Sequence, residues 1–170
     1  MSYRWMGAVL VIVGCGGFGF SMAAGYRREA ATLRQLIRVL NYMEWEMQYR
    51  LTALPELCRQ AGKEAKGPLR EVFANLAREL DWRSAPDAAS CMASALKRSR
   101  NLSRNCREIL MELGRTLGRF DLPGQLKGLQ EVRKACQGEL DALEKNRDVR
   151  LRSYETLGLC AGAALAILLL

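Results

Sequence analysis

The sequence predicts an all-α protein, an antiparallel bundle of about six helices flanked by N- and C-terminal membrane segments. An apolar stretch without a charged side chain lies at each end of the 170-residue chain, over residues 5–26 and 156–170. Between them, apolar residues recur at helical spacing and no strand-like alternation persists. All 18 acidic residues and all but one of the 26 basic residues lie in this middle segment.

The first apolar stretch predicts a transmembrane anchor over residues 1–26. As an α-helix, residues 5–26 would be about 33 Å long, which is enough for the roughly 30 Å hydrocarbon core of a bilayer. Small residues over 21–25 also fit a cleavable signal peptide, which stays as an alternative. The length of the stretch, and Arg27 and Arg28 directly after it, favour a retained anchor.

The bundle is expected in residues 27–155, and its first helix over residues 28–51. This helix carries an apolar stripe with helical spacing. The stripe consists of Leu33, Leu36, Ile37, Leu40, Met43, Met47 and Leu51. A second row, Tyr42, Trp45 and Tyr49, lies on a neighbouring face. Apolar coverage on two faces indicates either a helix packed on more than one side or a surface for a partner.

Turn and capping residues divide the rest of the bundle. Thr52 as an N-cap, with Pro55 in the first turn, predicts a short helix that ends at Gly62. Three further helices are expected, over residues 68–80, from the turn at 84–87 to about residue 97, and after a cap at Asn101 or Ser103. A break at residues 121–124 precedes a proline-free helix that starts at Gln125 and extends toward the C-terminus.

The second apolar stretch, residues 156–170, predicts a C-terminal membrane segment. Its helical length of about 22 Å falls short of a full span. Snorkelling of Arg150 and Arg152, and Tyr154 at the interface, would narrow this gap. The alternative is a buried C-terminal helix that packs on the bundle.

Flanking charges predict the orientation. Arg27, Arg28 and Arg34 follow the first apolar stretch, and Lys145, Arg147, Arg150 and Arg152 precede the second, whereas only Arg4 lies outside them. By the positive-inside rule, the bundle is expected in the cytoplasm, with both termini across the membrane. Six cysteines that occur singly agree with a reducing compartment.

Composition argues against several function classes. The net charge of +8 suits anionic lipid head groups or acidic partners, but the basic residues are spread along the helices rather than clustered as for nucleic acid. The chain has no histidine, the commonest general base and metal ligand. The single cysteines are expected to be small buried hydrophobes. We therefore expect no enzyme activity, no cofactor, no metal and no small-molecule substrate.

Neither pair of nearby carboxylates predicts a catalytic site. Glu44 and Glu46 are two residues apart, so on a helix they diverge by about 200°. Glu108 and Glu112 share a helix face, but the arginines around them favour solvated salt bridges. Gly114 and Gly118 are expected to allow close backbone approach and a helix C-cap, or else to shape a contact ridge.

Together these features resemble the stage III sporulation protein AB family. The likeness rests on the N-terminal anchor, a long charged helix, the apolar C-terminus and several short motifs. The motifs are Glu44-Trp45-Glu46-Met47-Gln48-Tyr49, Thr52-Ala53-Leu54-Pro55, Leu113-Gly114-Arg115-Thr116-Leu117-Gly118, Asp121 and Gln125. The likeness covers essentially the whole chain. The family is itself similar to the cytoplasmic domains of inner-membrane platform proteins of type II secretion and type IV pilus machines.

The resemblance implies a non-enzymatic membrane platform subunit of a secretion-like channel complex between mother cell and forespore. Its expected place is the mother-cell membrane, with the bundle in the cytoplasm. Its expected partners are a secretion-type ATPase similar to stage III sporulation protein AA, other channel-complex proteins and membrane lipids. The residues expected to contact a partner are Glu44, Glu46, Tyr49, Gly114, Arg115 and Gly118. The alternative is a charge-driven membrane-surface regulator or scaffold without an ATPase partner.

Overall fold

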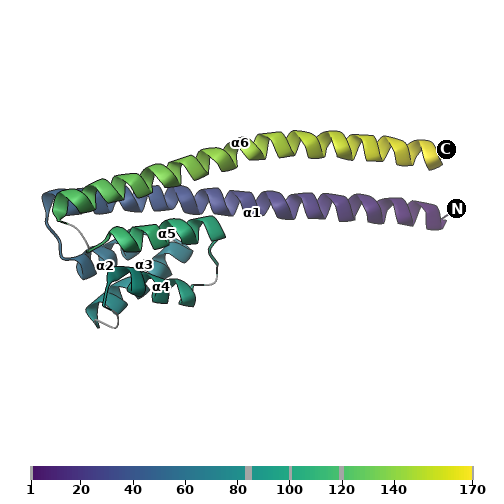
Figure 1. The fold of residues 1–170 in the computed structure, drawn as a ribbon. Coiled ribbons are helices and arrows are strands. Elements are labelled where there is room, and N and C mark those ends of the chain that lie inside the picture. The colour runs from purple at the N-terminus through teal and green to yellow at the C-terminus, as the bar shows by residue number, and fades with distance from the viewer. Residues whose placement is uncertain (1, 83–85, 100, 119–120, 170) are drawn as a thin grey trace. The chain divides into compact units, whose positions relative to one another are not determined.

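The computed structural model describes the backbone over residues 2–82, 86–99, 101–118 and 121–169, and side chains within these ranges between residues 25 and 146. The described backbone forms six helices and no strand, which confirms the predicted all-α class (Figure 1). The helices are α1 (Ser2–Tyr49), α2 (Leu54–Glu64), α3 (Pro68–Asp81), α4 (Ala88–Arg98), α5 (Arg104–Thr116) and α6 (Leu122–Leu169).

The chain divides into two units. One consists of Met1–Arg28 and Ala142–Leu170, and the other of Glu29–Asp141. The predicted membrane segments 1–26 and 156–170 fall within the first unit, and apart from Gly25 and Tyr26 their side chains lie outside the described residues. A search of the described residues finds no helix long and apolar enough to cross a membrane.

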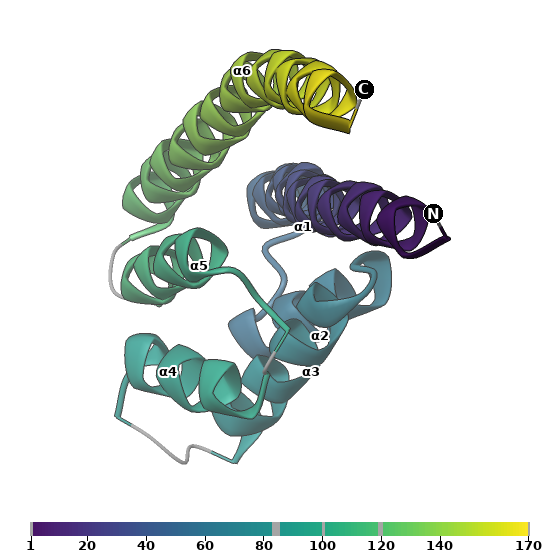
Figure 2. The ribbon, with the colours of Figure 1, turned by 90° about the vertical axis from the view of Figure 1, so that its right-hand side faces the viewer.

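The unit Glu29–Asp141 has an apolar core to which every helix contributes. The backbone of the helices that supply this core is drawn in Figure 2. The stripe predicted on α1 supplies Leu33, Leu36, Leu40 and Met43, each at most 1% exposed. The other helices add Leu57, Leu69, Phe73, Leu76, Met92, Leu110, Leu113 and Leu129. Leu51 was expected in the same stripe but is 71% exposed, because it lies two residues beyond the end of α1 and has a left-handed backbone with φ of 51°.

Helices α1 and α6 run antiparallel within this unit. Gln130 Nε2 donates a hydrogen bond to Glu44 Oε1 at 2.7 Å, and Arg133 Nη1 donates to Asn41 Oδ1 at 2.9 Å. Moving three residues forward along α6 therefore corresponds to moving three residues back along α1. The same pair is joined where the Cys136 thiol approaches the carbonyl oxygen of Leu33, at 3.5 Å.

The four shorter helices pack in sequence order, α2 on α3, α3 on α4 and α4 on α5. Side-chain caps set two of their starts. The Asp87 carboxylate accepts a hydrogen bond from the backbone N–H of Ser90, and the Ser103 hydroxyl accepts one from the N–H of Cys106. Of the two caps considered for α5, Ser103 is therefore the one used.

Two expected helix starts differ in the structure. Thr52 is not the N-cap of α2: Ala53 takes that position, and the Thr52 hydroxyl instead donates to Glu46. The expected break at residues 121–124 is shorter than predicted, because α6 already begins at Leu122. The Asp121 carboxylate accepts a hydrogen bond from the Gly124 N–H, which places Pro123 in the first turn, where proline needs no N–H partner.

Candidate interaction surface

Glu46 joins the end of α1 to the segment that leads into α2. Its side chain is buried, with the residue only 3% exposed. Oε1 accepts a hydrogen bond from the Tyr42 hydroxyl at 2.9 Å, Oε2 accepts one from the Thr52 hydroxyl at 2.8 Å, and the Arg50 guanidinium lies 3.5 Å away. Burial and the bond to Glu46 raise the pKa of Tyr42 to about 12. The Glu46 carboxylate thus holds the α1–α2 corner.

Glu44 faces a different helix. Besides its bond to Gln130, its carboxylate lies 3.8 Å from the Arg133 guanidinium, and its side chain is 19% exposed. Glu44 therefore links α1 to α6, whereas Glu46 links α1 to the start of α2. The predicted divergence of these two carboxylates is confirmed.

An exposed aromatic cluster lies at the end of α1. Trp45 is 48% exposed and Tyr49 is 67% exposed, and their ring centroids are 5.9 Å apart. The Arg50 guanidinium lies 5.4 Å from the centre of the Trp45 ring, a cation–π contact. Tyr42, the third member of the predicted row, is half-buried through its bond to Glu46. The row thus divides into one residue that supports the fold and two that face solvent.

The C-terminal half of α5 holds the other three predicted residues. Gly114 is buried where α5 crosses α4, and a Cβ there would lie 2.6 Å from Met92 Cβ, so the close-approach interpretation is confirmed. Gly118 follows the end of α5 with φ of 72°, a backbone conformation that suits glycine. Arg115 is exposed and donates to Glu112 Oε2 at 3.0 Å.

The six predicted contact residues form two groups, one on α1 and one at the C-terminal end of α5, and one member of each group lies beside the start of α2. Glu46 binds Thr52 just before α2, and a Cβ on Gly118 would lie 3.3 Å from Leu54, its first residue. Within the described part of the chain, no hydrogen bond or ion pair joins the two groups. Tyr49 and Arg115 present exposed side chains, whereas Glu44, Glu46 and Gly114 are engaged within the bundle.

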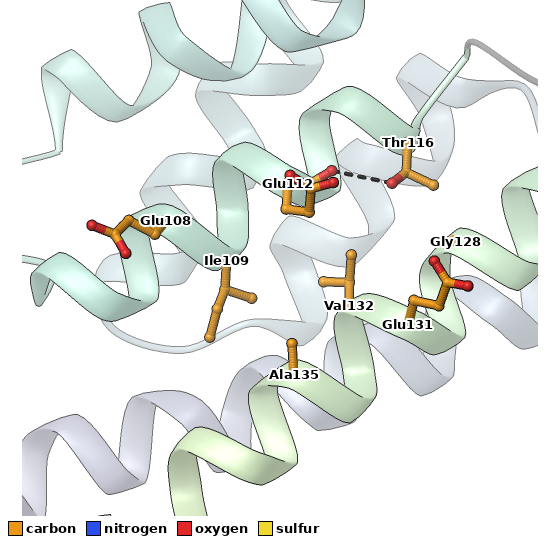
Figure 3. Close-up of a pocket in the computed structure, with 8 residues that line it drawn as sticks. All are labelled: Glu108, Ile109, Glu112, Thr116, Gly128, Glu131, Val132 and Ala135. Carbon is orange, nitrogen blue, oxygen red and sulfur yellow. Dashed lines mark hydrogen bonds between the residues drawn. The ribbon is translucent and has the colours of Figure 1, made fainter.

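A groove between α5 and α6 was not predicted (Figure 3). Its volume is about 250 Å³. Apolar side chains of Ile109, Val132 and Ala135 face one another across it, and carboxylates lie along its rim (Figure 3). These rim carboxylates belong to Glu108, Glu112 and Glu131. Thr116 and Gly128 line one end, where a Cβ on Gly128 would overlap the methyl group of Thr116, so α5 and α6 approach very closely there.

The ion pairs on the α5 side of this groove were expected from the sequence, but the contact of α5 with α6 was not. The expected surface ion pairs are present, because Arg104 lies 3.0 Å from Glu108 and Arg115 lies 3.0 Å from Glu112. Predicting the groove would have required knowing that Glu131 and Val132 of α6 lie opposite α5. That contact joins residues about twenty positions apart in the sequence, and no local sequence pattern indicates it.

Burial makes the cysteine thiols of the bundle unreactive. Cys58, Cys91, Cys106 and Cys136 are buried and unbridged, which confirms that they act as small hydrophobes. Burial raises the pKa of the Cys58 and Cys106 thiols to about 12 and that of Cys136 to about 11. Such thiols stay protonated near neutral pH and are poor nucleophiles. Among the described residues, no cluster of cysteine and carboxylate side chains is suited to hold a metal ion.

Fold and surface together define a helical-bundle protein with exposed aromatic residues at the end of α1 and a groove between α5 and α6. The stage III sporulation protein AB family model matches residues 4–170. Stage III sporulation protein AB of Bacillus subtilis (strain 168) is 27% identical over 170 residues, which cover 98% of this chain and 99% of that protein. A solved structure of stage III sporulation protein AB is similar with a TM-score of 0.63 at 23% identity, covering 72% of this chain and 98% of that chain, and shows the same fold. The chain belongs to the stage III sporulation protein AB family.

Proposed function

We propose that this chain is a non-enzymatic membrane platform subunit of a secretion-like channel complex between mother cell and forespore. Residues 1–26 and 156–170 would tether it to the mother-cell membrane, and the bundle would face the cytoplasm. Membership of a sporulation protein family and the apolar stretches over residues 5–26 and 156–170 support this proposal. The buried, protonated thiols favour a scaffold over a thiol-dependent enzyme.

The bundle would dock a cytoplasmic assembly ATPase at the corner where α1 ends and α2 begins. The observation that carries this assignment is the exposure of Tyr49, the last residue of α1, beside Trp45. Exposed aromatic residues are enriched at protein interfaces because they bury a large area with few rotatable bonds. Arg115 is exposed in the last turn of α5, and its guanidinium would add a charged contact at the edge of the ATPase interface.

Glu44 and Glu46 would support this surface from within. Their carboxylates are already engaged by Gln130, Tyr42 and Thr52. A charge reversal at either position would therefore disturb the fold as well as the surface. The exposed pair Tyr49 and Arg115 gives a cleaner test of partner binding.

The test is capture of the secretion-type ATPase by the full chain solubilised in detergent from sporulating cells. We expect Tyr49→Ala combined with Arg115→Glu to reduce the captured ATPase by about tenfold. The matched control is Arg70→Glu, at an exposed arginine of α3 that has no ion pair with any described residue. Undiminished capture by the double variant would refute this docking site.

The same preparation tests the alternative function. Absence of ATPase capture from the unmodified chain, together with liposome binding that declines steeply with salt, would favour a charge-driven surface regulator. Liposome binding that persists at high salt would instead indicate anchoring by the apolar ends.

A further inference from the structure

The outer face of α1 presents a basic and aromatic stripe. Arg34, Arg38 and Trp45 form this outer stripe, and all three are exposed on the face opposite the buried leucines. Their spacings of four and seven residues keep them in line along the helix. Arg38 has no ion pair or hydrogen bond with any described side chain. The stripe therefore offers positive charge and a large aromatic ring to a partner.

The groove between α5 and α6 has the complementary chemistry. Its floor is apolar, and its three ionisable lining residues are all glutamates. Glu108 and Glu112 pair with Arg104 and Arg115, whose side chains are 90% and 62% exposed. Such exposed pairs contribute little and can exchange partners at low cost. Glu131 has no ion-pair partner among the described residues.

The outer stripe and the groove lie at the same level along the bundle. Because Gln130 lies beside Glu44 and Arg133 beside Asn41, residues 128–135 of α6 run alongside residues 39–46 of α1. Arg38 is thus level with the Ala135 end of the groove, and Trp45 with its Gly128 end. On α5, Thr116 abuts Gly128, so Glu108, two turns earlier, belongs to the Ala135 end (Figure 3). Copies standing side by side would bring Arg38 to Glu108 without sliding along the bundle axis.

We propose that copies of this chain associate head to tail, with the outer stripe of one copy in the α5–α6 groove of the next. Arg38 would pair with Glu108, and Trp45 would cover the Gly128 end between Thr116 and Glu112. The contact is heterologous, so it produces a closed ring or an open row rather than a symmetric dimer. The side-by-side orientation of the copies rests on the membrane tether of the proposed function. The complementarity of the outer stripe and the groove does not depend on that tether.

A second copy is the occupant that the structure favours, because both halves of the interface are present on one chain. Charge sign, the aromatic ring and the level along the bundle all match. A different partner protein that bound only the outer stripe, or only the groove, would not account for the match between these two surfaces of one chain.

Self-association of the purified full chain in detergent tests the proposal, measured by sedimentation over a range of protein concentrations. We expect reversible association that Arg38→Glu and Glu108→Arg each weaken by about tenfold, since each places like charges together. The charge-swapped double variant Arg38→Glu with Glu108→Arg should recover association. Arg70→Glu is the matched control and should leave association unchanged. Circular dichroism checks that each variant is folded.

A mixing experiment separates head-to-tail contact from a symmetric one. Trp45→Asp disables the outer stripe but leaves the groove intact, whereas Glu108→Arg disables the groove but leaves the stripe intact. At a protein concentration where the unmodified chain associates but each weakened variant alone stays monomeric, an equimolar mixture should stop at dimers, because only one intact interface can form. Association insensitive to Glu108→Arg, or a chain that is monomeric at every concentration, would overturn the proposal. No ATPase is present, so this outcome is independent of the test of ATPase docking.

Discussion

The Thr52 hydroxyl donates a 2.8 Å hydrogen bond to the buried carboxylate of Glu46, across the corner between α1 and α2. The Tyr42 hydroxyl donates a hydrogen bond to the other oxygen of this carboxylate and also lies 3.2 Å from Gln60 Oε1 on α2. One acidic side chain thereby ties the end of a long helix to the helix that follows it. The two hydroxyl donors and the nearby guanidinium satisfy a carboxylate that would otherwise be costly to bury.

We expect Glu46→Ala to lower the free energy of unfolding by about 2 kcal/mol, because the part-buried hydroxyls of Tyr42 and Thr52 would lose the carboxylate that accepts their hydrogen bonds. Thermal unfolding of the chain in detergent, followed by circular dichroism, measures this change. Glu44→Ala is the comparison: its bond to Gln130 is nearer to solvent, so it should cost less than half as much. Equal effects of the two substitutions would contradict the structural role assigned to Glu46.

We expect Gly128→Ala to destabilise the bundle by about 1–3 kcal/mol, because the added Cβ would overlap the Thr116 methyl group between α5 and α6. Gly138 on the same helix has open space around its Cα, so Gly138→Ala should instead stabilise by roughly 0.5–1 kcal/mol through helix propensity. Thr116→Ser, which removes the methyl group, should partly rescue Gly128→Ala. Thermal unfolding of the three variants checks all of these signs.

We expect Gly118→Ala to cost about 1 kcal/mol of stability, because φ of 72° is unfavourable for a residue with a Cβ. Asparagine tolerates this backbone region better, so Gly118→Asn should cost less than Gly118→Ala. The difference between the two unfolding free energies isolates the backbone effect. An alanine variant as stable as the asparagine variant would indicate that the turn relaxes.

Stability should fall as the pH rises above about 9. The ordinary pKa of a thiol is 9.0, whereas burial raises that of Cys58 and Cys106 to about 12 in the folded bundle. Between these values the unfolded chain releases protons that the folded chain retains, so alkali favours unfolding. The thiol contribution to stability is complete below pH 9 and is lost progressively up to about pH 12.

Unfolding measured from pH 8 to 11 tests this dependence. Cys58→Ala removes one of the titrating thiols and should make the decline with pH shallower, while creating only a small cavity. A decline of unchanged steepness in this variant would mean that other groups, such as Tyr42, dominate the alkaline transition.

Most of the helical framework was predictable because its signals are local. The stripe on α1, the caps at Asp87 and Ser103, and Pro68 at the start of α3 all depend on residues within one or two turns. One exception occurred where a side chain binds a partner outside its own turn. Thr52 has the residue type of a helix cap, but its hydroxyl donates to the buried carboxylate of Glu46 instead of capping α2.

The candidate surface was predictable only in part. Helical geometry alone showed that Glu44 and Glu46 point apart and that Glu108 and Glu112 share a face with arginines nearby. It did not show that Glu46 is buried, nor that Trp45 and Tyr49 stay uncovered while Tyr42 does not. These outcomes depend on which neighbouring helix lies against each face of α1.

The order of residues along the chain therefore determined the all-α class, the number of helices and the apolar faces, because helical periodicity and capping act over a few residues. Tertiary packing decided the pairing of α6 with α1, the contacts of each carboxylate and the groove between α5 and α6. The groove depends on the close approach of Gly128 to Thr116, which are 12 positions apart, and the pairing of α6 with α1 rests on hydrogen bonds between residues 86 to 103 positions apart. Such contacts result from the combined packing of all six helices, and no local pattern encodes them.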